Sequence, residues 1–274
     1  HYSENEISQA VRRGTLTGKG GAWDLIAQRV ASVPDYAARF MAVYPDVTAP
    51  QDIAFTDISN AVAAFMDFEW RSDTAPFDAL LAGAHSYSGA QARGLELFYG
   101  AAGCSACHSG PLLTDFGFHA MGQPQLGPGK AARFERHARD EGRFRVTGRE
   151  EDRFAFRTPS LRNVALTGPW GHSGAYSDLT SFVAAHADPT AALQSFDRSG
   201  VVLPEFEAAD WRIMDDPAEV AAISAAVEVE PLALEAQEVA DIVAFLHSLT
   251  DPAMKAGRLG VPTAVPSGLR VPKP

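Results

Sequence analysis

The only two cysteines of the chain, Cys104 and Cys107, lie three positions apart, and His108 follows the second directly. The pattern C-x-x-C-H is the attachment signature of c-type haem. Two thiols with this spacing on a helical turn match the two vinyl groups of a porphyrin, to which they add as thioethers. The neighbouring imidazole then lies beneath the ring and can bind the iron. The motif predicts one covalent haem c with His108 as its proximal ligand.

Two other interpretations of the cysteine pair compete with haem attachment. A disulfide between the two thiols, as in thioredoxin-like redox motifs, needs a βαβ context that the surrounding sequence does not show. A zinc site needs further ligands at regular spacing, and His119 is the only local candidate. Haem attachment is therefore favoured over both.

The composition limits the classes of protein that remain. A hydrophobic content of 46% with 9% aromatic residues supports a packed core and argues against general disorder. No apolar run approaches the roughly 18 residues that a membrane span needs. The net charge of −11 argues against nucleic-acid binding, because no basic field is available to neutralise phosphates. An acidic surface suits a basic partner protein, and equally suits solubility alone.

Apolar residues recur at helical spacing, whereas strand signals are scarce, so we predict an all-α fold with long loops. Thr56 is the expected N-cap of one helix, Pro34 separates two others, and no internal repeat is evident. The segments 120–153 and 154–174 are expected to be loops, and the proline-rich tail 259–274 is expected to be extended. The predicted helices cover 22–33, 35–44, 55–70, 88–100, 178–186 and 233–249.

Several segments, in this order, resemble the second haem domain of the bacterial dihaem cytochrome c peroxidases and their MauG-type relatives. They are "GCSACHSGPLLTDFGFHAMG", "FRTPSLRNVALTGPWGHSGAYSDLTSFVAAH" and "EVADIVAFLHSLTDP". Earlier segments, including "AWDLIAQRVASVPDYAARF", resemble the stretch that joins the two haem domains. The resemblance implies a helical segment over 1–84, a cytochrome c-like haem domain over 85–250, and an extended proline-rich tail over 251–274.

The second axial ligand of the iron cannot be chosen from spacing alone among the other histidines and methionines. The resemblance places it at His186, where typical peroxidases have methionine and MauG-type enzymes have tyrosine. Met121 and water are the alternatives, and a histidine that only caps a helix end is the simplest other role for His186. Two imidazole ligands would give a low-spin iron with a lower potential than a histidine–methionine pair.

The resemblance also implies roles for residues around the turn "LTGPWGHSG". The backbone carbonyls of Thr167 and Pro169 match positions that help to bind calcium between the two haem domains, and His172 stands where the family usually has "HDG". Arg157 and Arg162 are candidates for pairing with haem propionates, because a guanidinium matches a carboxylate bidentately. The alternative is that both are ordinary surface arginines.

The family has a first haem domain with its own C-x-x-C-H, where peroxide reacts, and this sequence contains no second motif. That domain has been removed, is a separate chain, or does not exist. The resemblance implies the electron-transferring half of an enzyme that reduces peroxide or uses it to oxidise a protein, with a small cytochrome c or other redox protein as partner. Candidates for relaying electrons are Trp70, Trp170, Tyr176 and Trp211.

Covalent haem c is normally assembled outside the cytoplasm, so a periplasmic location is expected. The chain opens on His1 rather than Met, and its first residues give no guide to targeting. The main alternative function is a monohaem electron-transfer subunit without peroxidase activity. A haem-based gas sensor is a weaker alternative, since it needs a distal ligand that detaches.

Overall fold

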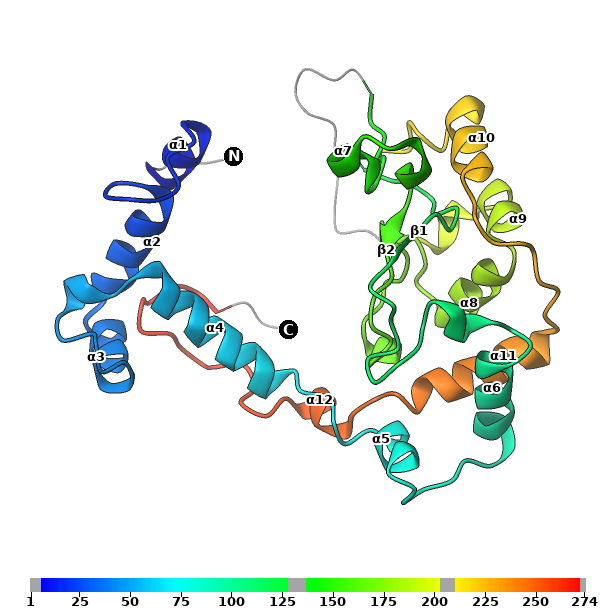
Figure 1. The fold of residues 1–274 in the computed structure, drawn as a ribbon, viewed down its shortest axis with the longest axis horizontal. Helices are drawn as coiled ribbons and strands as arrows, with labels where there is room; N and C mark the ends of the chain where they lie inside the picture. The colour runs from blue at the N-terminus through cyan, green and yellow to red at the C-terminus, as the bar shows by residue number, and fades with distance from the viewer. Residues whose placement is uncertain (1–5, 128–136, 203–209, 272–274) are drawn as a thin grey trace. The chain divides into compact units, whose positions relative to one another are not determined.

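The computed structural model describes residues 6–127, 137–202 and 210–271. The chain divides into two compact units (Figure 1). One, here called the flanking unit, comprises His1–Arg71 with Ala253–Pro274, and the other, the 72–252 unit, comprises Ser72–Pro252. Of the helices described, none has both the length and the apolar character needed to cross a membrane.

The all-α prediction is confirmed, because the strands in the described residues are two short ones. They are β1 (Phe118–His119) and β2 (Phe156–Arg157), which pair antiparallel with Phe118 opposite Arg157. The segments predicted as loops also contain a short helix, α7 (Phe144–Thr147), and single 3-10 turns at Glu150–Asp152 and Val164–Leu166.

The flanking unit is built from short helices around a small apolar cluster of Ala37, Val47 and Ile53. Pro34 is the first residue of its helix, a position where the missing N–H costs no hydrogen bond. Its elements are α1 (Glu6–Arg12), α2 (Ala22–Ala31), α3 (Pro34–Val43), a 3-10 turn (Pro50–Asp52), α4 (Phe55–Glu69) and α12 (Pro252–Ala256), which begins at the boundary with the other unit.

Helix α4 begins differently from the sequence expectation, and the prediction of Thr56 as N-cap is wrong. The N-cap is Ala54, whose backbone N–H donates to the carboxylate of Asp57 at 2.8 Å. A carboxylate in the first turn reaches back to the cap more directly than the Thr56 hydroxyl and also suits the positive end of the helix dipole. At the other end, buried Glu69 accepts from the N–H groups of Arg258 and Leu259 at 3.1 and 2.6 Å, which fastens the tail to α4.

The 72–252 unit contains the helices on both sides of the cysteine motif. These are α6 (Gly89–Tyr99), which precedes the motif, and α11 (Ala236–His247), which ends the unit, and the two pack against each other. The unit also contains α5 (Pro76–Leu81), α8 (Leu179–Ala187), α9 (Pro189–Gln194), α10 (Pro217–Ala225) and 3-10 turns at Cys104–Ala106 and Arg198–Gly200.

A glycine on α6 lets α6 and α11 approach closely. A Cβ at Gly94 would lie 1.9 Å from the backbone oxygen of Asp241, so a larger residue does not fit. Beside it, the Arg93 guanidinium donates to the Asp241 carboxylate at 2.6 and 2.8 Å. The core around this crossing includes Phe77, Phe98, Ile242, Phe245 and Leu246.

The start and the end of the 72–252 unit are joined by one buried carboxylate. Asp251 is fully buried and accepts from the N–H groups of Asp73 and Thr74, both at 2.9 Å, and from the Thr74 hydroxyl at 2.8 Å. Its own N–H donates to the side-chain oxygen of Asn163 at 2.7 Å. The two chain segments are therefore held together where the unit begins and ends.

The compact units differ from the ranges 1–84, 85–250 and 251–274 expected from the sequence. Helix α5 belongs to the 72–252 unit, because Phe77 is buried in its core. Whether the sequence-based ranges describe separate domains stays a prediction.

Candidate haem site

The two cysteines lie on a single 3-10 turn directly after α6. Gly103, at φ 65°, has the left-handed conformation that lets the chain turn from the helix into the motif. The N–H of His108 donates to the carbonyl of Cys104 at 2.9 Å, which closes the turn. Neither sulfur is in a disulfide. Burial raises the pKa of Cys104 to about 11 and also raises the pKa of Cys107, so both thiols are protonated at neutral pH.

The imidazole of His108 is oriented by a backbone carbonyl. Its Nδ1 lies 3.1 Å from the oxygen of Leu113, a fully buried residue with a φ of 50°. A carbonyl can only accept, so this bond assigns the proton to Nδ1 and leaves the Nε2 lone pair for a metal. Burial lowers the pKa of His108, with the Leu113 bond opposing it, which favours the neutral form that binds iron.

His186 shows the same arrangement on α8. Its Nδ1 lies 3.0 Å from the carbonyl oxygen of Phe182, one turn earlier in the helix. Burial lowers the pKa of His186, and the charge of His108 lowers it further, so the two imidazoles are close enough to interact electrostatically. The capping role expected as the alternative uses only Nδ1. Within the described residues, no hydrogen-bond partner lies on Nε2 of either histidine.

Apolar residues lie beside part of this donor set, and the ring of Phe182 lies 4.4 Å from the imidazole of His186 between centroids. Cys104, Leu161, Trp170, Phe182 and Val183 are partly buried hydrophobic residues that pack against the main core of the unit. Two free thiols and two neutral imidazoles with Nε2 available are the donor set that a covalent haem requires. The residues present therefore fit a haem c, with His108 and His186 as its predicted axial ligands.

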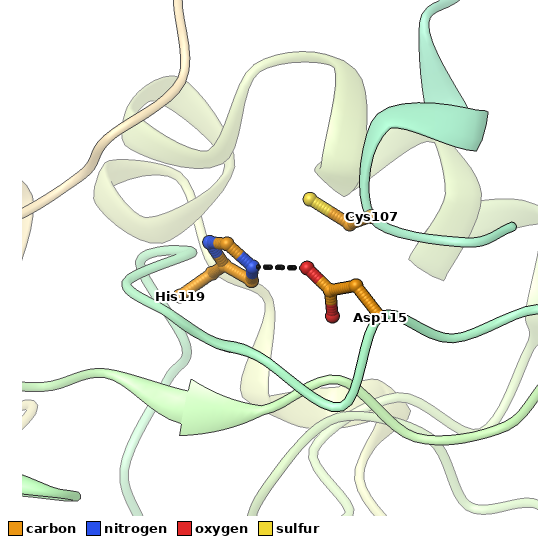
Figure 2. Close-up of side chains that lie close together, drawn as sticks. All are labelled: Cys107, Asp115 and His119. Carbon is orange, nitrogen blue, oxygen red and sulfur yellow. Dashed lines mark hydrogen bonds and ion pairs between the residues drawn. The ribbon is translucent and has the colours of Figure 1, made fainter.

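A second group of side chains lies beside Cys107 (Figure 2). Ligand atoms of Cys107, Asp115 and His119 all lie within 4.8 Å of one another. This is the kind of grouping that the zinc interpretation needs. The two polar members, however, already satisfy each other, since His119 Nε2 lies 2.8 Å from Asp115 and Nδ1 lies 3.3 Å from Glu228. Thioether formation at Cys107 would also remove the third ligand, so haem attachment stays favoured.

The pKa values of Asp115 and His119 are both shifted in the direction that favours the charged forms. Partial burial opposes ionisation of Asp115, but hydrogen bonds from His119, the N–H of Gly117 and Thr158 outweigh it and lower its pKa to about 2. The hydrogen bond to Asp115 raises the pKa of His119, and burial opposes this. The sequence pattern indicated His119 only as a candidate metal ligand. The i, i+4 spacing could have identified Asp115, but nothing in the sequence pointed to Glu228.

The two arginines expected at haem propionates have other partners in the structure. Arg162 has a largely buried side chain, pairs with Asp78 at 2.7 Å and donates from Nε to the carbonyl of Pro111 at 2.8 Å. Arg157 is exposed and lies over the ring of Phe116 at 4.8 Å. A propionate role for either residue stays a prediction, and Arg162 would have to share its guanidinium with Asp78.

Side chains contact the turn of Thr167 and Pro169 and the residues that follow it. The indole N–H of Trp170 donates to the carbonyl of Val164 at 2.9 Å. His172 lies 2.9 Å from the Asp140 carboxylate. Its ring stacks on Phe156 at 3.6 Å between centroids. Calcium binding by the carbonyls of Thr167 and Pro169 stays a prediction, as does Met121 as the alternative iron ligand.

Comparisons with known proteins give consistent matches. The model of the di-haem cytochrome c peroxidase family matches residues 4–86. The chain is 31% identical over 262 residues to cytochrome-c peroxidase IdrP1 of Denitromonas iodatirespirans, covering 87% of this chain and 61% of that protein. It is 31% identical over 230 residues to the methylamine utilization protein MauG of Methylorubrum extorquens, covering 82% of this chain and 52% of that protein. The chain thus spans only part of the length of these relatives.

Solved structures share the fold. A MauG-like protein associated with microbial copper homeostasis is 28% identical, with a TM-score of 0.58 over 91% of this chain and 70% of that chain. The diheme peroxidase BthA of Burkholderia thailandensis is 23% identical, with a TM-score of 0.61 over 99% of this chain and 68% of that chain. The second match supports the fold alone.

Proposed function

Because this chain is a relative of the dihaem cytochrome c peroxidases and the MauG proteins, we propose that it carries the electron-transferring haem of a periplasmic peroxidase-type oxidoreductase. The observation that carries the proposal is the pair His108 and His186, each with Nδ1 bonded to a backbone carbonyl and Nε2 available. An iron held from both sides has no open position for peroxide, so this haem would exchange electrons.

Each part of the site has a task in this role. Cys104 and Cys107 would fix the ring covalently, and the bound haem would supply one-electron exchange between ferric and ferrous iron. The carbonyls of Leu113 and Phe182 hold the imidazoles in one tautomer and orientation. Two imidazoles favour ferric iron more than a histidine–methionine pair does. A low potential for this haem follows.

The reaction with peroxide would take place at a second haem outside this sequence. It would reduce hydrogen peroxide to water, or use it to oxidise a protein partner. The names of the relatives support a peroxidase, and the chain covers 61% and 52% of the first two. A small basic cytochrome c or another redox protein would supply electrons, attracted by the net charge of −11.

An exposed stripe on α4 is the surface on which we place the second haem unit. The stripe consists of Val62, Phe65 and Met66, all substantially exposed. It belongs to a short similarity within the sequence: "VAAFM" over 62–66 resembles "IVAFL" over 242–246 in α11. In α11 this pattern packs against the helix that precedes the haem motif. By the same geometry, α4 would pack against the corresponding helix of a second haem unit, in the same polypeptide or in another.

Electron paramagnetic resonance of the haem-loaded chain tests the ligands. We expect a low-spin ferric signal that becomes high-spin in His186→Ala and stays low-spin in His186→Met, because thioether also binds iron. His247→Ala, on an exposed histidine of α11, is the control and should leave the signal unchanged. A low-spin spectrum that persists in His186→Ala would exclude the assignment.

Peroxide kinetics and haem counting separate the two candidate functions. We expect the chain alone to react slowly with peroxide, and His186→Ala to react faster. Native material that contains a second haem per complex and turns over peroxide supports the peroxidase. Native material with one haem and no associated haem protein supports the monohaem electron-transfer subunit, which the two-histidine ligation also favours.

A further inference from the structure

The loop that follows the haem motif is held at three successive backbone carbonyls by three different side chains. The carbonyl of Pro111 accepts from Nε of Arg162 at 2.8 Å. The carbonyl of Leu112 accepts from the hydroxyl of Ser160 at 2.6 Å. The third carbonyl, that of Leu113, lies 3.1 Å from Nδ1 of the predicted proximal histidine. The carbonyl that orients this ligand is therefore the last of a row whose first two members are fixed from outside the loop.

The two outside donors belong to residues 158–162, which follow β2 and which we call the support segment. Two further hydrogen bonds join this segment to the loop. The hydroxyl of Thr114 donates to the carbonyl of Thr158 at 2.8 Å, and the N–H of Thr158 donates to the carbonyl of Gly117 at 3.0 Å. Both threonines are buried. The support segment therefore holds the loop on both sides of Leu113.

Leu113 needs this support, because its backbone conformation is unfavourable for its residue type. Its φ of 50° lies in the left-handed region, which a leucine adopts only where the surrounding structure imposes it. The carbonyl that orients His186 differs, because Phe182 lies one turn earlier in α8 and the helix itself fixes its direction. Of the two predicted iron ligands, His108 is thus the one whose orientation depends on a loop.

Arg162 connects the support segment to α5 and to the core. Its side chain is 10% exposed, and its guanidinium pairs with Asp78 at 2.7 Å and lies 5.3 Å over the ring of Phe77. The other carboxylate oxygen of Asp78 accepts from the N–H of Ala75 at the start of α5, at 2.9 Å. The planar fork of an arginine can serve a carboxylate and a carbonyl at once, which the single nitrogen of a lysine does less well. Arg162 is therefore a fixed point for the loop.

We propose that the support segment positions the Leu113 carbonyl against His108 and thereby keeps the potential of the haem low. The proposal rests on the proposed function, in which His108 binds the iron. A hydrogen bond from Nδ1 to a fixed carbonyl makes the other ring nitrogen a stronger donor, and a stronger donor stabilises ferric iron more than ferrous iron. Ser160 and Arg162 act through the loop, so they are positioning residues.

Ser160→Ala is the sharper of two variants that test the support segment. Ser160 is exposed and uncharged, so its replacement should preserve the fold and the charge around the haem while it removes the donor to Leu112. Ser160→Thr restores a hydroxyl and is the conservative rescue. Ser195→Ala is the matched control, because this exposed serine also donates to a backbone carbonyl, at 2.7 Å, but at the end of α9.

Two quantities are measured on the haem-loaded chain. Redox titration gives the midpoint potential, and nuclear magnetic resonance of the ferrous, nitrogen-15-labelled protein gives the rate at which the Nδ1 proton of His108 exchanges with deuterated solvent. Ser160→Ala should raise the potential, by up to about a tenfold loss of preference for the ferric form or about 59 mV, and should speed the exchange. Arg162→Lys, which keeps the charge but loses the fork, should change both in the same direction. Ser160→Thr and Ser195→Ala should match the starting chain.

Unchanged potential and exchange in both Ser160→Ala and Arg162→Lys would overturn the proposal. A change in only one of the two quantities would overturn it as well, because the potential and the His108 hydrogen bond would then be unconnected. Failure of the proposed function gives a different result. A starting chain whose haem reacts rapidly with peroxide would overturn the electron-transferring role, while a raised potential with faster exchange in Ser160→Ala would still support the positioning of His108.

Discussion

Helices α4 and α11 carry similar short apolar sequences but have different surroundings. In α11, Ile242, Phe245 and Leu246 are 2%, 0% and 4% exposed. At the corresponding positions of α4, Val62, Phe65 and Met66 are 53%, 42% and 43% exposed. Residue type is nearly constant between the two, so the difference lies in what covers each helix. The stripe of α11 has α6 as its partner, brought close by Gly94.

An apolar helix face specifies the need for a partner and not the partner itself. Fully burying one large apolar side chain contributes about 1.5–3 kcal/mol, so three such side chains left in water forgo a substantial stabilisation. Contiguous exposed apolar surface of this kind marks an interaction site. This is the physical reason for placing the second haem unit on α4.

The largest expected effect follows from removing the haem motif, the feature that distinguishes the 72–252 unit. Replacing both Cys104 and Cys107 with serine should abolish covalent haem, because no thioether can form. Intact mass and haem staining after denaturing electrophoresis measure the loss, and Ser105→Ala is the control that should keep one haem. Covalent haem that persists in the double variant would show that the attachment site lies elsewhere.

A core truncation tests the buried side of the comparison. Phe245→Ala should lower the free energy of unfolding by about 3–5 kcal/mol, because it leaves a cavity between α6 and α11. Urea unfolding followed by circular dichroism measures it. A loss below about 1 kcal/mol would mean that the two helices are not packed as described.

The matching truncation in the exposed stripe of α4 tests whether Phe65 is unpacked in this chain. Phe65→Ala should change the free energy of unfolding by about 0.5 kcal/mol or less in this chain, because the ring is already largely hydrated. In native material that carries the second haem unit, the same change should cost more, toward the value for a buried phenylalanine. A large loss of stability in the isolated chain would contradict the exposure described for Phe65, since the stripe would then already be packed.

The smallest expected effect is on the pH dependence of stability, through the charges of His119 and Asp115 beside the haem motif. The raised pKa of His119 means that its contribution to stability is present below about pH 6.5 and is lost as the pH rises through its folded pKa. Asp115, with its pKa lowered to about 2, contributes above about pH 4 and loses this contribution as the pH falls toward 2. The pair should therefore stabilise most strongly between these limits.

The variant His119→Gln should flatten the alkaline side of the stability profile, by about 1 kcal/mol or less because the pair is partly solvated. Unfolding midpoints at several pH values measure this. His85→Gln is the control, since His85 pairs with no carboxylate in the described part of the chain. An unchanged profile in His119→Gln would show that the pair contributes nothing to stability.

The haem motif was predictable from the sequence because its chemistry is local. Cys104, Cys107 and His108 are nearly adjacent, so no tertiary information is needed. Helices of ten residues or so, such as α2, α6 and α11, were predicted to within a few positions because they span enough turns to show periodicity. The short helices α5, α9 and α10 were not, although each begins with proline at a first-turn position, a local start signal that was available.

What the sequence could not supply is long-range. Glu228 reaches His119 across 109 positions, and the ring of Trp211 lies 6.2 Å from that of Phe196 between centroids. Such neighbours depend on how loops pack, and composition does not encode that. The exposure of the α4 stripe also could not be predicted from the sequence. Periodicity shows which face of a helix is apolar, but not which other element packs against that face.

The carboxylate of Asp251 accepts hydrogen bonds from the backbone N–H groups of Asp73 and Thr74, and the N–H of Asp251 donates to the side chain of Asn163. The chain therefore enters and leaves the 72–252 unit at neighbouring points on its surface. A domain whose ends lie close together can be inserted into a loop of another protein, because the two ends of that loop do not have to move apart. Residues 72–252 can therefore be transferred as one intact module into another protein. A fragment that lacks either residues 73–74 or Asp251 would lose the hydrogen bonds that join the two ends.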